Sequence, residues 1–238
     1  MLAVVLVGFS RTLFLRPLFQ VPAIPWYAYA HGSVMTMWFM LLVVQSSLVA
    51  AQRTDAHRRL GILGAALAVV VVILGLLITL KIPGHFKIVG YTSTGGPPHL
   101  TSLPTAIRAL WGDIGTLTFF LVLVATGVCM RRRPEVHKRL MLLASMTMIA
   151  PALGRVTEFP DLSGITVAAP TVTVLLRIVP IGIALGLPLT LAAYDLRGSR
   201  RVHPATAWGL LGFVGVAVAT RVVIPATAVG EALWKALG

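Results

Sequence analysis

The residues from Leu60 to Leu80 form a run of 21 residues without one charged side chain. An α-helix needs about 20 apolar residues to cross the ~30 Å hydrocarbon core of a bilayer. The whole chain is 57% hydrophobic, and only 11% of its 238 residues are charged. A soluble domain could not cover so many apolar side chains with polar surface. We therefore predict an all-α polytopic membrane protein, because transmembrane β-strands would alternate in short segments instead.

The net charge of +13 comes largely from three short basic clusters, at 53–59, 131–139 and 197–201, which hold 11 of the 20 lysines and arginines. Such clusters are typical of cytoplasmic turns and can contact anionic lipid headgroups. They do not form a continuous basic face, so we expect no nucleic-acid partner. We predict a multi-pass protein of the bacterial inner membrane with a cytoplasmic N-terminus.

The apolar segments predict six or seven transmembrane helices, at about 1–15, 32–51, 55–80, 113–130, 134–153, 168–194 and 204–224. Residues 81–112 are rich in Gly, Pro, Ser and Thr and predict an ordered loop on the outer side. We expect one integral membrane domain over residues 1–238. It would contain a four-helix core at 31–153 and flanking helices at 1–15, 168–194 and 204–224.

The core contains an internal repeat with a shift of 80 residues. The sequence AHRRLGIL, from Ala56, lies over VHKRLMLL, from Val136. Both hairpins run from the outer side to the inner side and back, so the repeat predicts a parallel duplication with pseudo-twofold symmetry along the membrane normal.

The repeat places His57 and His137 at equal depth on two helices that would face each other. Two imidazoles at one level can bind a single haem iron from opposite sides. The bases that follow them could pair with haem propionates; they are Arg58, Arg59, Lys138 and Arg139.

A second interpretation needs no cofactor. Asp55 and Glu135 complement the dipole in the first turn of a helix, and Pro134 is favoured there. Histidines and arginines are also ordinary residues at a cytoplasmic membrane boundary. On this interpretation the two motifs are helix starts and lipid anchors.

Residues 31–153 resemble the two-haem transmembrane cytochromes b of the ascorbate-dependent type. The match rests on HGSVM at His31, on the base-rich turn with His57, and on His137; Trp111 stands where the family has a fourth histidine. The resemblance implies haem b held by His57 and His137, with electrons supplied by a quinol or small reductant. The chain is equally similar to uncharacterised bacterial integral membrane proteins that carry an H-R-x-L-G hairpin.

Other polar residues at membrane depth have open assignments. His31 is either an interfacial side chain, a haem ligand with a partner other than histidine, or a proton or quinol contact. Arginines inside a membrane usually face the interior of the bundle and often mark functional sites. Arg155 and Arg177 either pair with carboxylates on the outer side (Asp113, Glu158 and Asp161) or form an outward-facing site for an anionic group. Arg221 can instead extend its charged end to the membrane surface. His85 and His99 form only a weak metal-binding pattern.

No residue is predicted to be catalytic. The chain lacks a Walker A loop and the G-x-S-x-G and H-E-x-x-H motifs, and its single cysteine, Cys129, excludes an intrachain disulfide. We predict an electron-transfer protein similar to a b-type cytochrome. The alternative is a cofactor-free membrane protein, such as a small transporter or an accessory subunit of a larger membrane complex.

Overall fold

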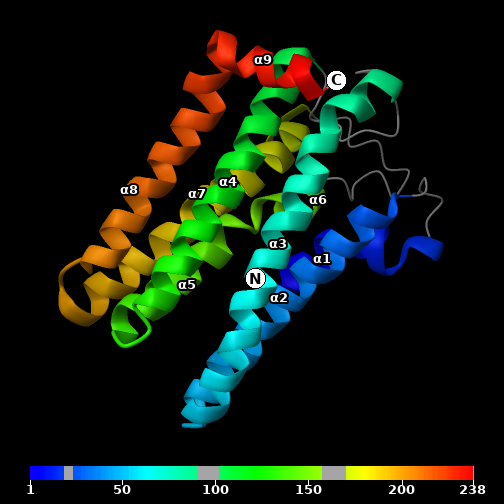
Figure 1. The fold of residues 1–238 in the computed structure, drawn as a ribbon. Helices are drawn as coiled ribbons and strands as arrows, with labels where there is room; N and C mark the ends of the chain where they lie inside the picture. The colour runs from blue at the N-terminus through cyan, green and yellow to red at the C-terminus, as the bar shows by residue number, and fades with distance from the viewer. Residues whose placement is uncertain (19–23, 90–101, 157–169, 238) are drawn as a thin grey trace.

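The computed structural model describes residues 1–18, 24–89, 102–156 and 170–237, and these residues fold entirely into helices and turns (Figure 1). The α-helices are α1 (Leu2–Gly8), α2 (Trp26–Ala50), α3 (Thr54–Val89), α4 (Leu103–Cys129), α5 (Pro134–Thr147), α6 (Ala150–Val156), α7 (Pro170–Ser199), α8 (Pro204–Val218) and α9 (Ala228–Leu237). Short π and 3-10 turns follow α1, at Ser10–Phe14 and Arg16–Leu18, and continue α8, at Ala219–Val223 and Ile224–Ala226.

Three short turns connect antiparallel neighbours: residues 51–53 between α2 and α3, 130–133 between α4 and α5, and 200–203 between α7 and α8. Gln52 and Arg200 reverse the chain with positive φ angles of 59° and 54°. All three turns lie at the same end of the bundle, at the lower left of Figure 1. The three basic clusters of the sequence therefore gather at one end, which we call the basic end.

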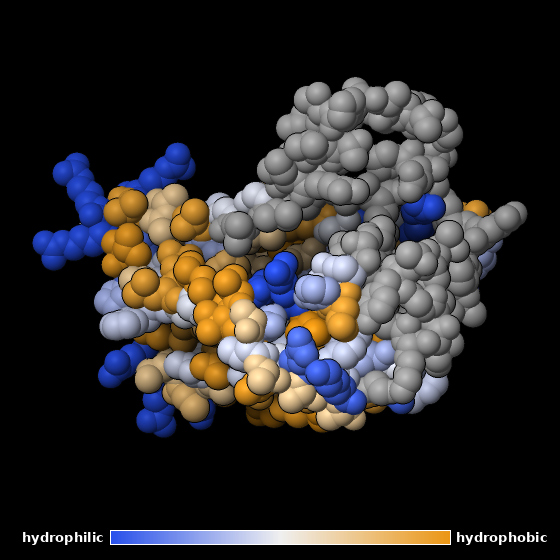
Figure 2. Space-filling model, turned by 90° about the horizontal axis from the view of Figure 1, so that it is seen from above, coloured by the Kyte–Doolittle hydropathy of each residue, from blue (hydrophilic) through white to orange (hydrophobic). Residues whose placement is uncertain are grey.

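Among the residues that the structure describes, four helical segments are long and apolar enough to cross a membrane: Trp26–Ala50, Thr54–Gly84, Leu103–Cys129 and Pro204–Ala226. Large apolar side chains remain exposed along them, for example Ile62 at 74% and Trp208 at 72%. On the face that Figure 2 shows, hydrophobic side chains cover much of the described part. Soluble proteins rarely expose apolar surface on this scale, so the fold is that of a membrane protein. Further spans at 1–15, 134–153 and 168–194 stay predictions, and so does the duplication.

The centre of the core joins α2, α4 and α5. The rings of Trp38 and Phe120 meet edge to face with their centroids 5.0 Å apart. The indole of Trp38 also donates a hydrogen bond of 3.2 Å to Ser145 Oγ. Phe39 and Leu143 are at most 1% exposed beside them. An aromatic pair with a satisfied indole N–H fixes the depth at which these helices pack.

Several predicted helix ends were wrong. The segment predicted as one helix over 134–153 divides into α5 and α6, because Pro151 has no N–H and its ring clashes with the preceding turn. The connection predicted over 81–112 is partly helical, since α3 continues to Val89 and α4 begins at Leu103. In α4 a proline occupies the first turn, where its missing N–H costs nothing. Helix α2 begins at Trp26, and α9 was not predicted.

Candidate functional site

The structure brings the two motif histidines together at the basic end. The rings of His57, in the first turn of α3, and His137, in the first turn of α5, have centroids 6.2 Å apart and planes at 84°. Both side chains are half-buried. The pair therefore lies between the apolar core and the basic turns, as the sequence repeat led us to expect.

A backbone carbonyl orients His137. The Nδ1 atom of His137 lies 2.8 Å from the carbonyl oxygen of Gly127, in the last turn of α4. A carbonyl can only accept, so Nδ1 donates and the neutral ring keeps its lone pair on Nε2. This is the arrangement typical of a metal-binding histidine, whose second nitrogen donates to a carbonyl.

Gln45 of α2 orients His57. When its amide is oriented so that the nitrogen faces acceptors and the oxygen faces a donor, the nitrogen donates to His57 Nδ1 at 2.6 Å and to the His57 carbonyl at 3.2 Å, and the oxygen accepts from the Gly61 N–H at 3.0 Å. Because Nδ1 accepts in this arrangement, the proton of a neutral His57 ring is on Nε2. The two histidines thus differ in tautomer, with one Nε2 donor and one Nε2 acceptor.

The bases predicted to surround the histidines divide into two groups. Arg58 and Arg59 are exposed at the start of α3. Arg139 is only 6% exposed, and its guanidinium is held by carboxylates. Lys138 is bound to Glu135, with 2.8 Å between Nζ and Oε1. Arg58 and Arg59 are therefore the bases left open for an anionic group beside the histidines.

The buried partner of Arg139 is Asp195, near the end of α7. Arg139 donates to Asp195 Oδ1 from Nε at 2.9 Å and from Nη2 at 2.6 Å. Oδ2 accepts from Thr206 Oγ1 at 2.6 Å and from the backbone N–H of His203 at 3.0 Å. Burial raises the pKa of Asp195, but the hydrogen bonds from Arg139, Thr206 and His203 outweigh it and hold the pKa at about 2. This network fastens α5, α7 and α8 together beside the histidine pair.

The other predicted haem position looks different. The His31 ring lies over Gly75 of α3, where an added Cβ would be 3.4 Å from His31 Cε1. Its Nδ1 is buried and has no hydrogen-bond partner among the described residues. Trp111, which aligns with His31 in the repeat, donates from its indole to the carbonyl of Gly230 in α9 at 3.2 Å. Trp111 therefore anchors the C-terminal helix to α4.

A second polar cluster surrounds Asp113 in α4. The charges of Arg221 and Arg155 both act on Asp113, and the charge of Arg155 also acts on His31. Arg221 lies in the π turn after α8 and donates to Thr116 Oγ1 at 3.1 Å. The ion pair predicted between Asp113 and Arg155 stays a prediction. The predictions for the remaining residues lie outside what the structure describes. These residues are Glu158, Asp161 and His99, together with the side chains of Arg177 and His85.

No family model, curated protein or solved structure matches the chain. Function must therefore be inferred from the geometry. Two imidazoles with fixed orientations can share a metal ion, or can pass a proton between groups. Within the described residues no cluster of three or more His, Cys, Asp or Glu side chains could hold a metal ion, so a metal at this site would depend on the histidine pair.

Proposed function

We propose that the protein is a membrane electron-transfer protein that holds haem b between His57 and His137. The observation that carries this proposal is the 6.2 Å separation of the two rings. Imidazole nitrogens bind metals at about 2.0–2.1 Å, which places two rings on opposite sides of one ion roughly 6 Å apart between centroids. The bound haem would supply one-electron chemistry, and a quinol or small reductant would be the electron donor.

The surroundings of His137 support this role. The hydrogen bond to Gly127 fixes the ring and leaves the lone pair of Nε2 available to iron. Arg58 and Arg59 are exposed near His57, where guanidinium groups can pair with propionates. Arg139, which the sequence also assigned to the propionates, would have to leave Asp195 to do so. We therefore assign propionate pairing to Arg58 and Arg59.

The contact between Gln45 and His57 sets a condition on the proposal. His57 can offer its Nε2 lone pair only when Nδ1 carries the proton, and the Gln45 amide must then turn so that its oxygen accepts. That turn would place the amide oxygen near the His57 carbonyl and the amide nitrogen near the Gly61 N–H. Haem binding must therefore stabilise an arrangement that the neighbouring backbone opposes.

A cofactor-free membrane protein is the second candidate, and the same contact favours it. With the amide donating to Nδ1, Gln45 ties His57 to α2, just as the Gly127 carbonyl ties His137 to α4. Both histidines would then be packing residues. The basic end would serve only to orient the protein in the inner membrane, with the N-terminus in the cytoplasm.

A reduced-minus-oxidised absorption spectrum of the detergent-purified protein, expressed with ample haem, separates the two candidates. We expect a sharp α-band in the parent protein. The His57→Ala and His137→Ala variants should each lose it, because each removes one of the two residues that would hold the haem.

His203→Asn is the matched control. His203 lies at the same end, where its ring accepts a hydrogen bond from the Ala205 N–H and caps α8, and asparagine is also a good cap. This variant should keep the spectrum. A flat spectrum in the parent, or full haem retention after either of the first two substitutions, would refute the proposal.

A further inference from the structure

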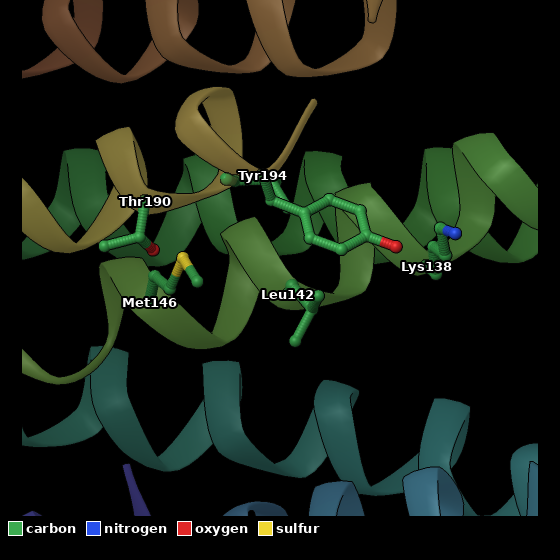
Figure 3. A pocket seen from close by; sticks show the side chains of 6 residues that line it. Lys138, Leu142, Met146, Thr190 and Tyr194 are labelled. Carbon is green, nitrogen blue, oxygen red and sulfur yellow. The ribbon is translucent and has the colours of Figure 1, made fainter. Parts of the chain in front are cut away.

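A groove lies between α5 and α7 at the basic end and has a volume of about 280 Å³ (Figure 3). On α5 it is lined by Lys138, Leu142 and Met146, which are four residues apart and so share one face of the helix. On α7 it is lined by Thr190, Leu191 and Tyr194. The groove therefore runs along both helices, in the direction of the predicted membrane normal.

The polarity of the lining changes along the groove. Figure 3 shows Thr190 and Met146 at one end, and Tyr194 and Lys138 at the other. The Lys138 ammonium lies 5.8 Å from the centroid of the Tyr194 ring. The end with Lys138 is the one nearer the basic turns, because Lys138 is in the first turns of α5 and Tyr194 is near the end of α7. The groove is thus apolar at membrane depth and cationic at headgroup level.

The charges at the cationic end favour an anionic occupant. Arg139 and Asp195 neutralise each other inside the bundle. Glu135 pairs with Lys138 and also with Arg139. Arg197 follows Tyr194 by three residues, on the same face of α7, and is exposed. Three cations (Lys138, Arg139 and Arg197) therefore stand against two carboxylates (Glu135 and Asp195), which leaves a net positive charge at this end.

We propose that this groove binds an anionic phospholipid of the leaflet at the basic end. An acyl chain lies against Leu142, Met146 and Leu191, and the phosphate lies between Lys138 and the Tyr194 hydroxyl. Basic pockets between transmembrane helices on the cytoplasmic side are known to bind anionic headgroups. The site does not depend on haem, so it can be present whether or not the proposed function is correct.

Native mass spectrometry of the detergent-purified full chain can test the site, by titration with phosphatidylglycerol or with phosphatidylcholine of the same acyl chains. We expect tighter binding of the first phosphatidylglycerol than of the first phosphatidylcholine. Lys138→Gln should weaken phosphatidylglycerol binding by about fivefold, as expected for one base near an anionic lipid, and should leave phosphatidylcholine binding unchanged.

Two more variants separate the groove from general surface charge. Lys235→Gln is the matched control. Lys235 also pairs with a glutamate of its own helix, since its Nζ lies 2.9 Å from Glu231 Oε2 in α9, but it is far from the groove in sequence. It should bind both lipids as the parent does. Thr190 is exposed on the groove wall, so Thr190→Trp should fill the groove without disturbing the core and should weaken binding of both lipids.

Circular dichroism of each variant should show parent-like helix content and thermal midpoint, so that lost binding reports on the site. Three results would overturn the proposal: equal binding of the two lipids by the parent, equal effects of Lys138→Gln and Lys235→Gln, or undiminished binding in Thr190→Trp.

Discussion

Replacing Asp195 with alanine should destabilise the bundle more than most single substitutions. The Asp195 carboxylate is 0% exposed and accepts from Arg139, Thr206 and the His203 backbone. Its loss leaves the Arg139 guanidinium buried, with only the exposed Glu135 as a partner. Removing one member of a buried ion pair costs about 3–5 kcal/mol, because the remaining charge stays desolvated.

The thermal unfolding midpoint in detergent measures this loss. In a chain of 150–250 residues each kcal/mol shifts the midpoint by about 2–4 °C, so the expected decrease is about 6–20 °C. Glu135→Ala removes the other carboxylate that binds Arg139, but Glu135 is 59% exposed and remains in contact with water. This control should change the midpoint far less, because exposed ion pairs contribute little.

The double variant Arg139→Met/Asp195→Leu tests the reasoning directly. It removes both charges together and should recover most of the stability, because apolar residues often replace a buried ion pair at little cost. A double variant as unstable as Asp195→Ala would show that the desolvated guanidinium is not the cause. A midpoint unchanged in Asp195→Ala would refute the energetic role of the pair.

Two further predictions concern the same region and the neighbouring helix contact. Folding lowers the pKa of Asp195 from an ordinary 3.8 to about 2, so the stability that it contributes is complete above pH 3.8 and is lost as the pH falls toward 2. The thermal midpoint of the parent should decrease over this range. The midpoint of Asp195→Asn should decrease less. Gly115→Ala would place a Cβ 2.5 Å from Thr220 Cγ2 and should lower the thermal midpoint. Gly215→Ala is the control, because an added Cβ there would have nothing within 4 Å, and it should leave the midpoint unchanged.

The helical character and the membrane class of the fold could be predicted because they depend on local composition. A charge-free run such as Leu60 to Leu80 has one stable solution in a bilayer, which is a helix with its backbone hydrogen bonds satisfied internally. Helix ends were predicted less well. Residues 81–112 were predicted as a connection because of their Gly, Pro, Ser and Thr content, yet α3 continues to Val89 with Pro83 fully buried inside it.

The histidine pair could also be predicted, since a repeated motif at equivalent positions brings equivalent side chains to one level. The residues that orient the pair could not. Gln45 precedes His57 by 12 residues on a different helix, and the Gly127 carbonyl carries no side-chain signal. Both contacts depend on how α2 packs on α3 and how α4 packs on α5, which hydrophobic periodicity does not specify.

The consecutive bases Lys138 and Arg139 show how tertiary packing divides one sequence motif between two roles. Neighbouring residues point about 100° apart around a helix, so only one of them can face the core of the bundle. Arg139 takes that position because Asp195, 56 residues later, supplies a buried carboxylate, and its planar guanidinium can donate to several acceptors there. Lys138 is left on the side of α5 that faces the groove, with 42% of its side chain exposed. The sequence treated both bases as haem neighbours. In the structure Arg139 joins α5 to α7 through Asp195, and Lys138 pairs with Glu135 beside the groove.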